Sequence, residues 1–154
     1  MSPNTSFARR TRFAYGLRVS RSFRNGMRQD LRYVEPSTNK AHCKDCFSSM
    51  VKLDELVEHD QVVSGKFWLV QKHQANVTFA IYSCSNSNDR YVDSDAMRRL
   101  GEVKITVEDP AKVTNPDTYT FTVSFTFGGT ELQATAVDDQ TQKQAQTSVV
   151  FVAE

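Results

Sequence analysis

The sequence predicts an all-β protein, an antiparallel β-sandwich of about seven or eight short strands. The clearest observation is residues 119–127, where apolar side chains alternate strictly with threonine and serine. A period of two places every apolar side chain on one face of a strand. Further short apolar runs are separated by turn-forming residues, and no stretch has a convincing helical period. A strand with one apolar face needs a second layer to cover it, which predicts two packed sheets.

The elements follow in chain order from alternation and turn residues. Residues 47–57 fit a helix or a strand equally well, and 83–89 have the composition of a loop. Residues 21–46 are polar and lack a clean period, so we expect a long loop there, with at most a short strand at 31–34. The other expected strands are 12–20, a short buried run at 67–70, 77–82, 103–107, 119–127, 130–137 and 149–152.

Gly128 and Gly129 are predicted to form a two-residue hairpin turn, because glycine freely adopts the positive φ that such turns use. That turn would place large apolar residues opposite small ones on the covered face. The expected pairs are Phe127 with Thr130, Phe125 with Leu132, Val123 with Ala134, and Phe121 with Ala136.

The 154 residues are enough for one domain with a real core. We expect residues 1–10 to form an N-terminal arm or linker, and residues 11–154 to form the sandwich domain with the long loop 21–46. Hydrophobic residues make up 39% of the chain and charged residues 24%, which is typical of globular proteins.

The net charge of +1 hides an asymmetry, since residues 1–40 carry nine basic and two acidic residues, and the remainder has a net charge of −6. The arginines are spread along the chain without the aromatic residues of a nucleic-acid module, so we expect them on solvent faces and expect no nucleic-acid partner. No apolar run approaches the ~20 residues of a membrane span. The N-terminus lacks a hydrophobic signal region and there are only three cysteines, which favours a cytoplasmic protein.

Motifs that would carry chemistry are weak. Cys43 and Cys46 form a CxxC pair beside His42, but a structural zinc site needs four nitrogen or sulfur ligands, and no second pair exists. A redox CxxC would open a helix in a βαβ unit, which is not predicted. No phosphate-binding loop, dinucleotide fingerprint, nucleophile elbow or HExxH occurs. We therefore expect a chain without catalytic residues, metal or cofactor, with Cys43 and Cys46 as weak metal candidates.

Several short motifs follow one another over most of the chain, at residues 9–17, 77–82, 100–101, 123–125, 127–136 and 132–138. Taken in order, they resemble the β-sandwich substrate-binding domain of 70 kDa heat-shock chaperones. The similarity is greater still to the divergent branch that contains heat shock 70 kDa proteins 12A and 12B.

The resemblance implies a peptide-binding module without a helical lid, whose ATPase domain, with its ATP and Mg²⁺, would precede this chain. Family members hold an extended apolar peptide in a groove, with a central pocket for one leucine-like side chain. Carried over by motif, Leu17 would lie at the groove, Val77 and Phe79 would form the pocket, and Phe67 a flanking wall. Plain sandwich core is an equally good interpretation of these four residues. The implied partners are unfolded or extended polypeptide segments, or a specific client protein, and the chain's own nucleotide-binding domain.

Two other functions remain open. The chain could be a protein–protein adaptor whose basic loop 21–46 binds an acidic partner, with Arg24 and Arg28 as the expected contacts. Such binding would weaken steeply with salt. A zinc-dependent enzyme is the third and least favoured hypothesis.

Overall fold

The computed structural model describes residues 8–150, which form eleven β-strands and three short 3₁₀ helices. The strands are β1 (Ala8–Arg10), β2 (Ala14–Ser22), β3 (Arg32–Glu35), β4 (Lys40–Val51), β5 (Leu56–Glu58), β6 (Val62–Trp68), β7 (Asn76–Cys84), β8 (Met97–Thr106), β9 (Thr120–Phe127), β10 (Glu131–Asp138) and β11 (Gln144–Val150). The 3₁₀ helices are η1 (Gln29–Leu31), η2 (Pro110–Lys112) and η3 (Pro116–Thr118).

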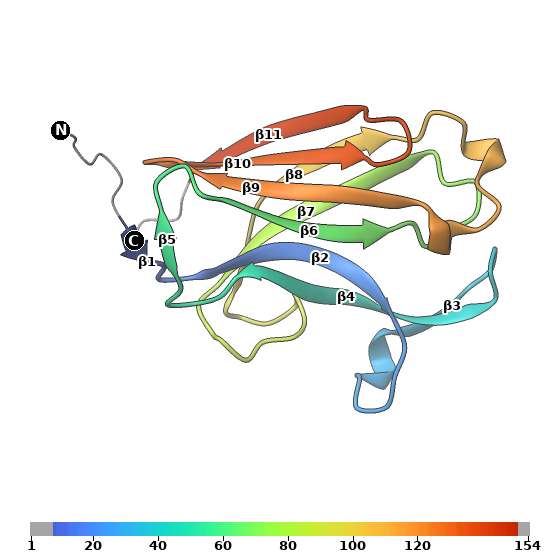
Figure 1. The fold of residues 1–154 in the computed structure, drawn as a ribbon. Coiled ribbons are helices and arrows are strands. Elements are labelled where there is room, and N and C mark those ends of the chain that lie inside the picture. The colour runs from blue at the N-terminus through green and yellow to red at the C-terminus, as the bar shows by residue number, and fades with distance from the viewer. Residues whose placement is uncertain (1–7, 151–154) are drawn as a thin grey trace.

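Two antiparallel sheets pack face to face (Figure 1). One has the order β11-β10-β9-β6 and the other the order β3-β4-β2-β7-β8, while β1 and β5 form a small two-stranded sheet of their own. The predicted all-β sandwich is confirmed, and residues 8–150 contain no α-helix and hence no helical lid.

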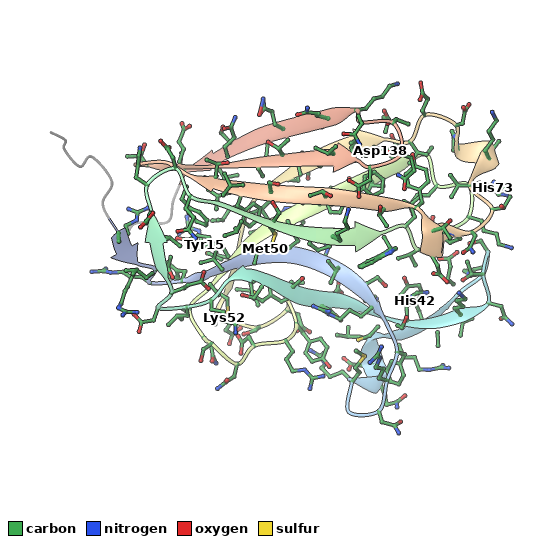
Figure 2. All side chains as sticks on the ribbon, viewed as in Figure 1. Tyr15, His42, Met50, Lys52, His73 and Asp138 are labelled. Atoms are coloured by element: carbon green, nitrogen blue, oxygen red, sulfur yellow. The ribbon has the colours of Figure 1, made fainter. Side chains whose placement is uncertain are left out.

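The core lies between the two sheets and draws on both. The four alternating apolar residues of β9 are at most 1% exposed. From the facing sheet, the ring of Tyr15 packs edge-on against Phe127, with 5.9 Å between centroids, and Figure 2 shows Tyr15 between the layers. Phe79 of β7 makes the same kind of contact with Phe121 at 5.7 Å. Such edge-to-face contacts add to the stabilisation that apolar burial provides.

The sandwich is closed along one side, where β8 meets β11. Gly101 of β8 makes this approach possible: a Cβ built there would lie 2.6 Å from a methyl group of Val149. On the opposite side, β6 ends its sheet and faces β2 and β4 without pairing with them. The two sheets therefore meet at one edge and leave the other open.

The expected long loop at 21–46 is wrong for half of its residues, since only 23–31 and 36–39 lie outside strands, whereas the short strand expected at 31–34 is present as β3. Within it, β2 continues to Ser22, β3 forms at Arg32–Glu35, and β4 begins at Lys40. The pairing of β2 with β4 shifts register between Val19 and Arg21, and Asp45 has a φ of 58°. Such bulges move side chains from one face to the other, so the period of two that identifies a strand is lost.

The predicted register of the β9–β10 hairpin is also wrong, by two residues. Phe127 pairs with Leu132, and Phe125 with Ala134. The Gly128 amide donates to the Glu131 carbonyl at 2.9 Å, which leaves Gly129 and Thr130 as the turn. A shift of two keeps every side chain on its predicted face. Among the described glycines only Gly26 has a left-handed φ, so the diglycine does not use the expected conformation.

The expected buried run 67–70 is only partly buried. Phe67 and Leu69 are 8% and 3% exposed, but Trp68 between them is 55% exposed. The reason is that β6 has one face on the core, so its side chains alternate between core and solvent. The expected last strand, 149–152, begins earlier, as β11 from Gln144, and residues 151 and 152 lie outside the described range.

Candidate groove at the open edge

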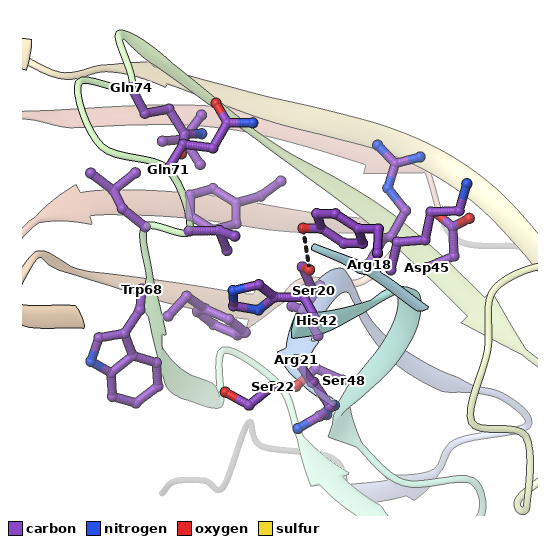
Figure 3. A pocket seen from close by; sticks show the side chains of 18 of the residues that line it. Arg18, Ser20, Arg21, Ser22, His42, Asp45, Ser48, Trp68, Gln71 and Gln74 are labelled. Carbon is purple, nitrogen blue, oxygen red and sulfur yellow. Dashed lines mark hydrogen bonds between the residues drawn. The ribbon is translucent and has the colours of Figure 1, made fainter. Parts of the chain in front are cut away.

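A groove of about 820 Å³ opens on the unpaired side of β6. Its walls are β6 and the segment that follows it, the start of β7, and the β2–β3–β4 face opposite (Figure 3). This volume lies within the range of ordinary ligand pockets, about 300–1,000 Å³. The groove exists because β6 is a sheet edge and the β2–β4 ribbon does not pair with it.

The apolar part of the groove contains three of the four residues that the sequence proposes for it. Phe67, Val77 and Phe79 line the cavity, and the rings of Phe67 and Phe79 lie 5.8 Å apart. Leu17 does not line it: its side chain is fully buried in the core cluster between the sheets. The difference follows from its position in β2: Leu17 lies between the two register shifts of the β2–β4 pairing, and its side chain packs in the core cluster that both sheets share.

A polar wall faces this apolar floor. The ring of His42 on β4 stacks on Tyr33 of β3, with 5.7 Å between centroids, and the Tyr33 hydroxyl shares a hydrogen bond of 2.8 Å with that of Ser20. Burial raises the pKa of Tyr33. His42 is 8% exposed, and neither of its ring nitrogens has a hydrogen-bond partner among the described residues. Figure 2 shows His42 between β4 and the β6 side of the molecule.

Sequence reasoning misses His42 as a groove residue. The sequence presents it only as a neighbour of the CxxC pair, because the bulges in this region hide the strand. The signal that could identify it is the alternation of Lys40, His42 and Lys44 with Ala41 and Cys43 at the start of β4.

The rim of the groove is basic. Arg18, Arg21, Arg24 and Lys44 line it, and none of the four forms an ion pair with a carboxylate in residues 8–150. Arg28, the other predicted partner residue, does not line the groove. It bonds to Asp93 at 2.8 Å and to Asp30 at 2.5 Å, and these hydrogen bonds raise its pKa further above the ordinary arginine value.

One end of the groove is bridged. The tip of the β3–β4 hairpin reaches across to the segments after β6 and before β9: the Lys72 amide donates to the Ser37 hydroxyl at 3.0 Å, and Lys40 forms an ion pair with Asp117. Both contacts are exposed, so each contributes little to stability. Their effect is geometric, because they hold the hairpin over the end of the cavity.

Cys43 and Cys46 are buried on the other face of β4, in a small cluster with Leu31. Burial, followed by a hydrogen bond to Cys43, raises the pKa of the Cys46 thiol to about 11. Within residues 8–150, no group of three or more histidine, cysteine or acidic side chains is arranged to hold a metal ion. The helices in the same range are three-residue turns, and none has the length or hydropathy of a membrane-spanning segment.

Fold and groove together define a β-sandwich with a ligand-sized groove at its one open edge. No family model matches the chain. Along almost its whole length it is similar to heat shock 70 kDa protein 12A of Homo sapiens, with 20% identity over 152 residues, 99% of this chain and 22% of the relative. The mouse protein of the same name is 21% identical over the same share of each chain. Heat shock 70 kDa protein 12B of Homo sapiens is 24% identical over 157 residues, 98% of this chain and 23% of the relative.

These similarities confirm the resemblance to the divergent 70 kDa heat-shock branch that the sequence motifs indicate. The chain spans about a fifth of the length of these curated relatives.

Proposed function

We propose that this chain is a non-catalytic polypeptide-binding module, resembling the substrate-binding region of a divergent 70 kDa heat-shock protein. The observation that carries the proposal is the groove at the open side of the sandwich, where the free edge of β6 runs beside an apolar floor. An extended segment of another protein would lie in this groove.

The free edge of β6 supplies the main-chain part of such binding. A strand at the end of a sheet leaves alternate N–H and C=O groups unpaired, and an extended peptide can bond to them as an added strand. Main-chain hydrogen bonds of this kind do not depend on the bound sequence. Selection therefore has to come from the side-chain pockets along the edge.

The apolar floor supplies one such pocket. Phe67, Val77 and Phe79 would receive an aliphatic side chain, whose full burial yields about 1.5–3 kcal/mol before the ordering costs of binding. This magnitude favours weak and reversible binding. We further propose, from the family resemblance, that a nucleotide-binding domain in the complete protein, with ATP and Mg²⁺, regulates the affinity of the groove.

The adaptor hypothesis loses part of its basis in this structure. It relies on a long basic loop at 21–46 with Arg24 and Arg28 as contacts, but half of that stretch is strand, and Arg28 is already bonded to Asp30 and Asp93. Arg24 remains available at the groove rim.

Trp68 makes the proposal directly testable, since it is the only tryptophan of the chain, lines the groove and is 55% exposed. Titration with an extended apolar heptapeptide should shift its emission to shorter wavelength with a saturable curve. Because the binding is weak, we expect a dissociation constant between about 1 μM and about 1 mM.

A matched pair of variants controls for non-specific effects. Val77→Asp places a charge on the groove floor and should weaken binding at least about tenfold, whereas Val62→Asp, on the exposed outer face of β6, should leave it unchanged. Absence of a saturable response up to about 1 mM peptide would contradict a working groove. Equal peptide affinity of the Val77→Asp and Val62→Asp variants would contradict it as well.

A further inference from the structure

Three buried side-chain nitrogen or oxygen atoms in the groove lining lack a hydrogen-bond partner, and they are the only side-chain atoms of this kind among the described residues. They are both ring nitrogens of His42 and the side-chain oxygen of Gln74. Buried polar groups are normally satisfied, and one that is not costs about 1–3 kcal/mol. Figure 3 shows the His42 ring pointing into the pocket, with Gln74 also at its wall. A bound group with both donors and acceptors would satisfy all three atoms.

The charge of the lining indicates what that group carries. Arg18, Arg21, Arg24 and Lys44 line the groove without a carboxylate partner in the described part of the chain, against a single unpaired acid, Asp45. Two other charged residues of the lining are paired, Lys66 with Asp139 at 2.9 Å and Asp117 with Lys40. The lining therefore keeps an excess of basic groups without a carboxylate partner.

We propose that the groove selects extended polypeptide segments that carry an acidic side chain, aspartate or glutamate, next to the apolar residue on its floor. This inference rests on the polypeptide-binding function proposed above and specifies its substrate class. The carboxylate lies among the basic residues of the rim and accepts a hydrogen bond from one nitrogen of His42. The other nitrogen and the Gln74 oxygen accept N–H groups of the bound backbone.

The chemistry of each partner is complementary. A neutral imidazole presents one donor and one acceptor, and a glutamine oxygen accepts only, so a peptide that offers both a carboxylate and backbone N–H groups matches the set. Hydrogen bonds to a charged acceptor are roughly twice as strong as neutral ones. The stack on Tyr33 holds the His42 ring in place before the segment arrives, which lowers the ordering cost of binding.

The test compares two nonapeptides that differ only in glutamate against glutamine beside the same central leucine, each titrated against the chain by Trp68 fluorescence. The glutamate peptide should bind about tenfold more tightly at low salt, a factor that corresponds to one charge-assisted contact. His42→Phe keeps an aromatic ring against Tyr33 but removes both nitrogens. It should reduce the preference to less than about twofold, and His42→Asn should keep more of it.

The basic rim is tested separately by exposed substitutions that do not threaten the fold. The double variant Arg21→Gln/Arg24→Gln should bind the glutamate peptide more weakly and should keep the same affinity for the glutamine peptide. Arg98→Gln, which removes one charge outside the groove, should change neither. If His42→Phe does not fold, this comparison decides the question.

The possible failures are distinguishable. If neither peptide binds, the polypeptide-binding function itself is contradicted. If both peptides bind with equal affinity, the groove binds polypeptide without selecting acidic side chains. The same conclusion follows if Arg98→Gln lowers the affinity for the glutamate peptide as much as Arg21→Gln/Arg24→Gln does. A single-stranded oligonucleotide that displaces the glutamate peptide at equal concentration would point to a nucleic-acid ligand and overturn the proposal.

Discussion

Asp138 ends β10 through its own side chain. It is 1% exposed and accepts the backbone amides of Gln140 at 2.9 Å and Thr141 at 3.2 Å, together with the Tyr119 hydroxyl. Burial first, and then this hydrogen bond, raise the pKa of Tyr119 above its usual range. Acidic side chains in turns commonly accept hydrogen bonds from the local backbone in this way.

The burial of the Cys46 thiol has a consequence that can be measured. Burial raises the pKa of its thiol from an ordinary 9.0 to about 11. Since only the thiolate reacts with iodoacetamide, the rate of Cys46 labelling in the folded chain should keep rising up to about pH 11, while in urea it levels off above about pH 9. Peptide mapping by mass spectrometry at a series of pH values measures both rates.

The sign of the associated stability change follows from the same shift. The unfolded chain loses this proton first as the pH rises, so the contribution of the thiol to stability is complete below pH 9.0 and is lost progressively towards about pH 11. Equal labelling rates in the folded chain and in urea at pH 8 would show that Cys46 is not buried.

At the scale of elements, β4 explains why the sequence misleads. Its twelve residues carry buried side chains on both faces, because His42 faces the groove while Cys43 and Cys46 pack with Leu31 behind it. The left-handed Asp45 interrupts the alternation midway. A strand of this kind has no simple hydrophobic period, so its first half resembles a loop in sequence. By contrast β9, which is regular and covered on one face only, is predicted almost residue by residue.

The β8–β11 contact supplies a prediction at this scale. Gly101→Ala should lower the free energy of unfolding by about 1–3 kcal/mol, because the new methyl group would lie 2.6 Å from Val149, whose β-branched side chain has little freedom to move. Urea unfolding measures the change.

Gly129→Ala is the matched control, since no atom lies within 4 Å of the place its Cβ would take and its φ is not left-handed. It should change stability by less than about 0.5 kcal/mol. Adding Val149→Ala to the Gly101→Ala variant should cost less than Val149→Ala does alone. Strict additivity would mean that the two strands are not in contact.

For the molecule as a whole, one core joins both sheets. The main cluster includes Tyr15 and Phe79 from one sheet and Phe121 and Phe127 from the other, so neither sheet keeps its apolar face covered without the other. Urea unfolding followed by Trp68 fluorescence should therefore coincide with unfolding followed by far-ultraviolet circular dichroism, as one cooperative transition. An earlier fluorescence midpoint would show that the β6 edge separates first.

The groove can be predicted from the sequence only in part. The family resemblance points to Phe67, Val77 and Phe79, and the structure brings all three to one cavity while leaving Leu17 in the core. Of the polar residues around that floor, the sequence indicates only Arg24, as a contact of the expected basic loop, and it does not indicate His42. The position of His42 depends on the pairing of β4 with β2 and β3 in a stretch where the sequence predicts a loop.

The chain by itself determined that this is a two-layer β-protein and which face of β9 and β10 is covered, because side-chain alternation is a local property that survives even a two-residue error in register. The tertiary structure alone decided where the sandwich closes and where it stays open. Gly101 lets one pair of edges meet, whereas the bulged β2–β4 ribbon keeps its distance from β6. Both the β8–β11 contact and the gap beside β6 involve residues that are far apart in sequence, so no local sequence pattern encodes them.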